Sequence, residues 1–130
     1  MIFVDSNVPM YLVGGEHPNK TLAARLVQRA VSRGERLVSD AEVIQEVLHR
    51  YVAINRRDAI QPAIDVLLGI VDQVFPIDLT DVERAKRLVL GSTRFSARDA
   101  LHIAVIQRRE VATVMTFDRA FDDVPGLTRL

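Results

Sequence analysis

The chain has 130 residues, of which 48% are hydrophobic and 26% charged, and its 17 basic residues balance its 17 acidic ones. This length fits one ordinary domain with a real core, the composition excludes a disordered chain, and zero net charge gives no overall field that attracts nucleic acid. The absence of cysteine excludes disulfides and thiolate metal sites and suits a cytoplasmic protein. No apolar run approaches the ~18 residues of a membrane span, and the N-terminal stretch MIFVDSN lacks the basic region of a secretory signal.

Short β-like runs alternate with segments of helical periodicity along the whole chain. The predicted strands cover residues 1–5, 36–39, 74–77, 111–116 and 127–130. Strands separated by helices predict right-handed crossovers and a parallel sheet that is covered on both faces. No repeat or long linker divides the chain, so residues 1–130 are expected to form a single α/β domain.

Helix signals fill the segments between these strands. Helices are predicted over residues 9–13, 18–34, 41–54, 56–73, 81–90 and 97–109. Asp40, Thr80 and Ser96 are the expected N-caps of the third, fifth and last helices. Gly34 and Gly91 are the expected stops of the second and fifth.

Two acids follow predicted strands and would therefore lie at one edge of a parallel sheet. Asp5 ends the first strand, and Asp118 comes two residues after the strand 111–116. In open parallel sheets, ligands gather at the carboxyl ends of the strands, where the strand order reverses. Each acid also has a structural interpretation, because Asp5 could form a turn and Asp118 could cap a short turn over RAFDD.

A third acid, Asp99, lies in the first turn of the last helix. The stretch from Ser96 to Asp99 resembles a capping box. Asp99 also shares a helix face with Ile103 and Ile106, so its carboxylate points toward the sheet, where an unpaired charge is costly and a bound cation would compensate it.

The helix over 41–54 offers Glu42 and Glu46 as further acids. Val43, Val47 and Tyr51 belong to its apolar stripe; Glu42 lies opposite the stripe and Glu46 nearer its margin, which favours Glu46 only mildly.

Other common catalytic arrangements are not visible in the sequence. His17, His49 and His102 form no His-x-x-x-His pair and are poor catalytic candidates, and neither a Gly-rich phosphate loop nor a G-x-S-x-G motif occurs. Carboxylates without imidazole or thiolate ligands select Mg²⁺ or Mn²⁺ and suit metal-assisted phosphodiester hydrolysis. An aspartyl-phosphate phosphatase would need a second Asp where Asn7 stands, and a phospho-receiver domain would need a Lys at a late strand end.

Four segments together resemble the PIN-domain ribonucleases, and among them the VapC-like toxins of toxin–antitoxin pairs. In chain order these segments are FVDSN, VSDAEVIQEVLHRY, FSARDALHIAVIQRR and VMTFDRAFDDVPGL, and the last two are the most specific. The resemblance covers the chain from its first strand to its last residues. It implies a three-layer α/β/α sandwich with a mainly parallel sheet, in a single PIN domain over residues 1–130.

The resemblance also implies a site and a reaction. The expected catalytic acids are Asp5, Glu46, Asp99 and Asp118. Asp5 and Asp99 would bind one or two Mg²⁺ or Mn²⁺ ions, with Glu46 and Asp118 bound directly or through water. Ser6, Asn7 and Thr116 match positions that support the acids, and Arg94 and Arg98 are either phosphate contacts or solvated surface. The implied activity is that of a cytoplasmic, metal-dependent endoribonuclease.

The resemblance implies protein partners as well. VapC-like toxins are neutralised by an antitoxin that lays a peptide into the groove and often presents an arginine to the acidic site. They commonly form homodimers, or a higher assembly with the antitoxin. Two alternatives stay open at this point: a solitary RNA-processing nuclease, and a non-catalytic PIN-like module that binds a partner protein. The presence of all four acids favours retained catalysis, although single-stranded DNA is not excluded as a substrate.

Overall fold

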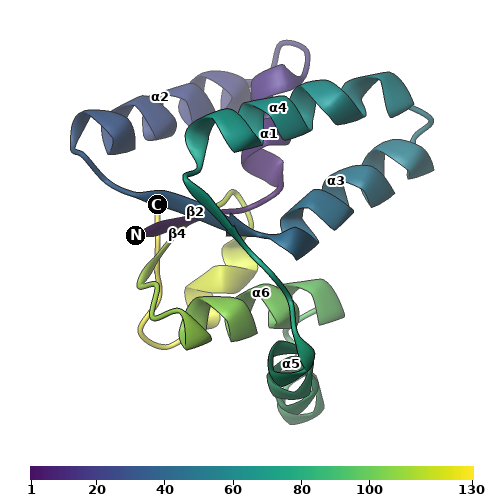
Figure 1. Cartoon of the computed structure of the whole chain (residues 1–130), viewed down its shortest axis with the longest axis vertical. Coiled ribbons are helices and arrows are strands. Elements are labelled where there is room, and N and C mark those ends of the chain that lie inside the picture. The colour runs from purple at the N-terminus through teal and green to yellow at the C-terminus, as the bar shows by residue number, and fades with distance from the viewer.

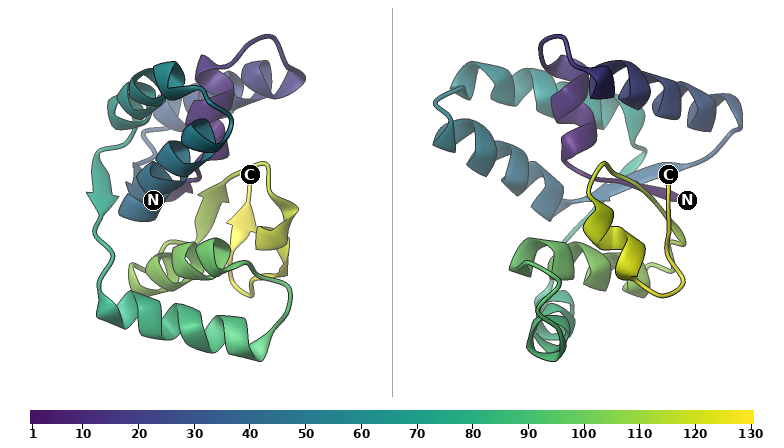
Figure 2. Two further views of the ribbon diagram at one scale, coloured as in Figure 1. Left: turned by 90° about the vertical axis from the view of Figure 1, so that its right-hand side faces the viewer. Right: turned by 180° about the vertical axis from the view of Figure 1, so that it is seen from behind.

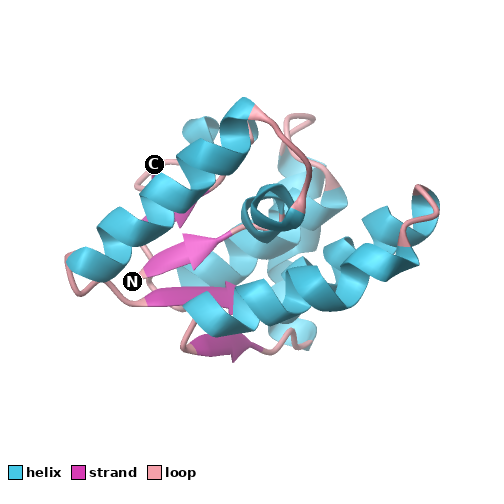
Figure 3. Cartoon of the chain, turned by 90° about the horizontal axis from the view of Figure 1, so that it is seen from above, coloured by secondary structure: helices cyan, strands magenta, loops and turns pink.

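A five-stranded parallel sheet forms the middle layer of the protein, which a computed structural model describes over residues 1–130. Its strands are β1 (Ile2–Val4), β2 (Leu37–Asp40), β3 (Gln73–Phe75), β4 (Thr113–Met115) and β5 (Thr128–Arg129). They lie in the order β3-β2-β1-β4-β5, and every neighbouring pair is parallel. The strand arrows visible from above point the same way (Figure 3).

Helices cover both faces of this sheet. The helices are α1 (Asn7–Val13), α2 (Pro18–Ser32), α3 (Ala41–Ala53), α4 (Ile60–Ile70), α5 (Leu79–Gly91) and α6 (Ala97–Arg108). The first four lie on one side of the sheet and α5 and α6 on the other, with α5 outermost (Figure 1). The short 3-10 helix η2 (Arg119–Asp123) lies on the same side as α6 (Figure 2). The predicted three-layer α/β/α sandwich is thereby confirmed.

The core explains why the central strand β1 is continuously apolar. All three residues of β1 are buried, because helices cover the sheet on both faces and leave no solvent-facing side. Helix α6 is nearly as enclosed, with every residue from His102 to Ile106 buried. No helix of the protein is long and apolar enough to span a membrane.

Most predicted helix ends are confirmed, and one is wrong. Asp40 caps α3 by accepting a hydrogen bond from the Val43 N–H at 2.9 Å, and Ser96 caps α6 in the same way. The predicted cap at Thr80 is wrong: Asp78 caps α5, and Asp78 and Asp81 form a reciprocal capping box. Asp78 has the extended backbone that a cap requires, which places Thr80 inside the first turn.

The helix predicted over residues 56–73 is shorter in the structure, where α4 covers Ile60–Ile70. A 3-10 turn, η1 (Arg57–Ala59), precedes α4, and Gln73 already belongs to β3. Pro62 lies in the first turn of α4, where its missing N–H costs no helical hydrogen bond.

The strand order creates a crevice at the carboxyl end of β1. From β1 the chain proceeds to β2 on one side, whereas β4 later pairs with β1 on the other side. The connections that leave β1 and β4 therefore diverge to opposite faces of the sheet. Such a topological switch point is where open parallel sheets bind ligands.

An ion pair joins the outermost helix to the rest of the protein. The guanidinium of Arg108, in the last turn of α6, donates two hydrogen bonds to the carboxylate of Asp81, at 2.6 and 2.8 Å. The Asp81 side chain is fully buried, while that of Arg108 is partly exposed. The hydrogen bonds from Arg108 lower the pKa of Asp81, although burial opposes this effect.

We expect Arg108→Gln to lower the free energy of unfolding by about 3 kcal/mol, because it leaves the Asp81 carboxylate buried without its partner. Urea denaturation at pH 7 measures the loss. The matched control is Lys86→Gln, which removes the exposed pair of Lys86 with Glu83 on α5 and should cost less than about 1 kcal/mol.

The stabilising contribution of the Arg108–Asp81 ion pair should decrease at low pH. Because the folded-state pKa of Asp81 is lower than its ordinary value of 3.8, the ion pair stabilises the protein above that value and loses its effect as the pH falls through the lowered pKa. Equal losses in the two variants, or a difference from wild type that grows in acid, would contradict this account.

Candidate functional site

Asp5 lies directly after β1, at the switch point of the sheet, and is 5% exposed. One oxygen of its carboxylate accepts a hydrogen bond from the Ser6 N–H, and the other accepts one from the hydroxyl of Thr116, both at 2.7 Å. Burial raises the pKa of Asp5 to about 6, although the charge of His102 and the bond from Thr116 oppose the rise. The ionised carboxylate is thus only partly compensated in the folded chain.

Thr116, the residue after β4, connects three of the residues expected at the site. Its hydroxyl oxygen accepts hydrogen bonds from the Asn7 side chain at 3.1 Å and from the Asp118 N–H at 3.0 Å, besides donating to Asp5. The Asn7 side-chain oxygen also accepts a bond from the Phe117 N–H. These bonds join the start of α1 to the segment after β4, so that the two loops at the switch point hold one arrangement.

Glu46 projects from α3 toward Asp5. One of its oxygens accepts a hydrogen bond from the Ser6 hydroxyl at 2.9 Å, and the other contacts Nε2 of His102. Burial alone would raise the pKa of Glu46, but the bond and charge of His102 and the bond from Ser6 lower it overall. Glu42 is half-buried on the same helix and forms no side-chain hydrogen bond with these residues.

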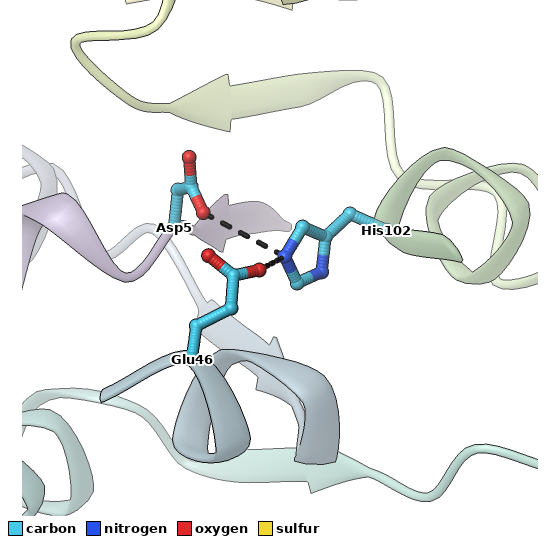
Figure 4. Close-up of side chains that lie close together, drawn as sticks. All are labelled: Asp5, Glu46 and His102. Carbon is cyan, nitrogen blue, oxygen red and sulfur yellow. Dashed lines mark hydrogen bonds and ion pairs between the residues drawn. The ribbon is translucent and has the colours of Figure 1, made fainter. Parts of the chain in front are cut away.

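His102 lies among the predicted acids, where sequence reasoning did not place it. It is 1% exposed, and its Nδ1 is 2.9 Å from the Asp40 carboxylate, while its Nε2 contacts Glu46 and is 3.8 Å from Asp5 (Figure 4). Burial opposes protonation of the ring, but hydrogen bonds to Asp40 and Glu46 raise the pKa of His102 well above its ordinary value.

A signal for this contact was present in the sequence. His102 is three residues after Asp99 and so lies near it on the helix surface, and Asp40 ends a strand at the same edge of the sheet. Sequence reasoning assigned Asp40 only its capping role, which its other carboxylate oxygen does perform.

Asp99 and Asp118 lie at the same edge but form no hydrogen bond with Asp5 or Glu46. Asp99 is half-buried in the first turn of α6, where its N–H donates to the Ser96 hydroxyl. Burial, and next the charge of Asp118, raise the pKa of Asp99. The Asp118 carboxylate accepts a bond from the Ala120 N–H and caps η2, which is the structural interpretation that the sequence left open for it.

A pocket of about 480 Å³ opens beside Glu46 and runs between α1 and α3. Ser6, Asn7 and Glu46 contribute polar groups to its lining, while Met10, Tyr11, Tyr51 and Ile54 supply apolar walls. Arg98 also lines it, whereas Arg94 is paired with Asp123 at 3.5 Å and is not part of the lining. Of the two arginines considered from sequence, Arg98 is therefore the one beside the acids.

The donor atoms of the site suit a divalent cation. Carboxylate oxygens of Asp5 and Glu46, together with a ring nitrogen of His102, lie within 4.8 Å of one another. Asp5 and Asp99 both have a raised pKa with burial as the main cause, so positive charge nearby would favour their ionised forms. A set made mainly of carboxylate oxygens matches the preference of Mg²⁺ and Mn²⁺.

Known proteins resemble this chain over its whole length. The family model described as "PIN domain" matches residues 2–127. A relative named "Ribonuclease VapC13", from Mycobacterium tuberculosis, is 59% identical over 130 residues, which cover 100% of this chain and 99% of the relative.

Two solved structures share the fold at low sequence identity. VapC20 of Mycobacterium tuberculosis, described as a sarcin-ricin loop cleaving toxin, has a TM-score of 0.75 at 21% identity and covers 91% of this chain and 90% of its own. A toxin-antitoxin complex from Klebsiella pneumoniae contains a chain that matches with a TM-score of 0.69 at 17% identity. The match covers 98% of this chain and 96% of the chain in the complex.

We expect Asp5→Asn to stabilise the protein in a buffer with EDTA at pH 7.5, by about 1–2 kcal/mol in urea denaturation. The folded-state pKa of Asp5 is about 6 instead of the ordinary 3.8, so between these values a rising pH ionises the unfolded chain more readily and lowers stability. The neutral amide avoids that loss, and its advantage should shrink toward pH 4.

Asp65→Asn on the exposed face of α4 is the matched control and should change stability little at either pH. A variant at Asp5 that is less stable than wild type at pH 7.5, and by the same amount at pH 4, would show that the ionised carboxylate does not oppose folding.

Proposed function

The chain belongs to the PIN-domain family, and we propose that it is a divalent-metal-dependent endoribonuclease acting as the toxin of a toxin–antitoxin pair. The observation that carries the proposal is that carboxylate oxygens of Asp5 and Glu46 lie within 4.8 Å of one another and of a ring nitrogen of His102, at the switch point of the sheet. A relative that matches the chain over its whole length is named a ribonuclease. Asp99 and Asp118 are the proposed further acids of this site, which is supported by the effect of the charges of Asp118 and Glu46 on the pKa of Asp99.

Asp5 and Asp99 are the proposed direct ligands of a Mg²⁺ or Mn²⁺ ion, with Glu46 and Asp118 holding it directly or through water. The fit is supported by the donor atoms, because carboxylate oxygens of Asp5 and Glu46 lie within 4.8 Å of each other. Burial raises the pKa of Asp5 and of Asp99, and the charge of His102 only partly opposes this rise. When bound, such an ion neutralises phosphate charge and lowers the pKa of a water molecule.

The remaining contributions come from residues of the chain itself. Thr116 and the Ser6 N–H orient the two oxygens of Asp5, while the Ser6 hydroxyl orients Glu46. Asn7 supports Thr116 from α1. Arg98, at the side of the pocket, would bind a phosphate of the RNA backbone, because its guanidinium presents a planar fork of donors.

The pocket between α1 and α3 is the proposed binding site of an antitoxin peptide. It has apolar walls and the carboxylate of Glu46 in its lining, so it suits a peptide that inserts apolar side chains and one arginine. The toxin–antitoxin complex of similar fold supports an antitoxin partner for this chain. The homodimer stays a prediction from the family resemblance, which light scattering of the purified chain would test.

We expect purified wild-type protein to cleave structured RNA in the presence of Mn²⁺, and Asp5→Asn and Asp99→Asn to lose at least about 100-fold in kcat/KM. Each change removes an ionised ligand while it preserves the size of the side chain. Gel analysis of the products measures the rate, and Asp65→Asn is the exposed control. Cleavage that continues undiminished in both variants, or in EDTA, would refute the metal-carboxylate mechanism.

In cells, we expect induction of wild-type protein to arrest growth and to leave specific RNA ends, which sequencing of those ends would identify. Asp99→Asn should remove the arrest, and co-expression of a short DNA-binding protein encoded just upstream should restore growth with the wild type. If Asp99→Asn arrested growth at the same protein level as wild type, toxicity would not depend on RNA cleavage and the proposal would be contradicted. RNA cleavage with no such upstream frame would favour a solitary RNA-processing nuclease.

A further inference from the structure

We propose that His102 is a positioning residue that ties the Glu46 carboxylate to Asp40 and so holds it ready for the cation. The inference rests on the proposed function, because the cation gives Glu46 its role. It gives a role to a buried histidine that is not itself one of the proposed metal ligands. We call the three side chains the Asp40–His102–Glu46 relay.

Asp40 is the fixed end of this relay. It is the last residue of β2, its side chain is 0% exposed, and one of its oxygens is bonded to the Val43 N–H at the start of α3. Its other oxygen accepts a hydrogen bond from Nδ1 of His102 at 2.9 Å. The Asp40 carboxylate is therefore immobilised by the helix that it caps, and it fixes the rotation of the imidazole.

The imidazole transmits that position to Glu46. With Nδ1 bonded to Asp40, Nε2 on the opposite side of the ring is directed at Glu46 and contacts its carboxylate. The ring also packs against Phe3 of β1, with ring centroids 5.5 Å apart, which restricts its tilt. His102 comes from α6 and Glu46 from α3, so the contact crosses from one helical layer to the other at the edge of the sheet.

Glu46 needs such support more than the other acids do. Its side chain has three rotatable bonds and reaches the site from the second turn of α3, and leaving these bonds free would cost entropy when a cation binds. Ser6 holds one carboxylate oxygen at 2.9 Å, and His102 contacts the other. Together they hold the carboxylate in a single orientation before the cation binds. Residues that orient a metal ligand by hydrogen bonding raise the affinity of the site for the metal.

The geometry favours positioning over direct ligation by His102. Both ring nitrogens have a carboxylate partner, Asp40 on one side and Glu46 on the other. A histidine ligand needs one unprotonated nitrogen with its lone pair free for the metal. Asp5, at 3.8 Å from Nε2, lies beyond hydrogen-bond distance, so the ring serves Glu46 first.

Two amide variants separate the two ends of the relay. In His102→Asn the amide nitrogen takes the place of Nδ1, so the bond to Asp40 is kept and the contact with Glu46 is lost. In His102→Gln the longer side chain places its amide nitrogen near the position of Nε2 and keeps the contact with Glu46. The matched control is His49→Gln, which changes an exposed histidine on α3.

Calorimetric titration with Mn²⁺ should show about tenfold or greater weakening in His102→Asn, a smaller loss in His102→Gln and no change in His49→Gln. With RNA, kcat should fall in the same order while KM stays near the wild-type value, because His102 is buried and does not touch RNA. Thermal midpoints recorded in parallel report folding separately, since both variants keep one polar partner at the buried position.

Two results would overturn the proposal. One is a His102→Asn variant with wild-type Mn²⁺ affinity and kcat but a lowered thermal midpoint, which would make the role purely structural. The other is nitrogen coupling from a histidine ring to bound Mn²⁺ in pulsed electron paramagnetic resonance of ¹⁵N-histidine-labelled wild type, which would make His102 a ligand.

Failure of the proposed function is recognised separately. If wild type neither binds Mn²⁺ nor cleaves RNA, the nuclease proposal fails, and ¹⁵N NMR of the metal-free protein then tests the relay. The relay predicts two slowly exchanging ring N–H signals of His102, of which Asp40→Asn shifts mainly the Nδ1 signal and Glu46→Gln mainly the Nε2 signal. Signals that neither substitution shifts would overturn the relay as well.

Discussion

The protein places three carboxylates around one buried imidazole, and the arrangement of its site depends on this contact. Asp5, Asp40 and Glu46 each lie within 4 Å of a ring nitrogen of His102. Burying a charge is costly unless a partner of opposite sign meets it. Asp5 follows β1, Asp40 ends β2 and Glu46 belongs to α3. A single ring on α6 therefore links elements that are far apart in the sequence.

The parallel sheet explains why these residues meet. Strands that run the same way all deliver their carboxyl ends to one edge, so Asp5, Asp40 and the Thr116–Asp118 segment arrive together without any local sequence relation. Burial of the apolar residues between the helical layers stabilises the fold. This stability offsets the cost of keeping a buried carboxylate such as Asp5 at the edge of the sheet. The polar residues of the site are thus found at the switch point, where the connections that leave β1 and β4 diverge.

Much of this could be predicted from the sequence, because the signals concerned are local. Apolar runs marked the five strands, and Asp40, Ser96 and Asp118 were recognised as caps from their place before a helix or turn. The error at Thr80 is also local: two candidate caps lay two residues apart, and the capping box of Asp78 with Asp81 decided between them. The partners of Glu46 and His102 could not be derived, because 56 residues separate the two and periodicity says nothing about contacts between layers.

The edges of the sheet limit how other proteins can attach to this one. The strands at the two edges are β3, with three residues, and β5, with two, and Pro76 follows β3 directly. Such short edges leave little unpaired backbone on which a foreign strand could extend the sheet, a device that also protects against aggregation. Pockets and helix faces are therefore the more accessible surfaces for protein contacts, and selectivity at such surfaces depends on shape and charge rather than on backbone pairing.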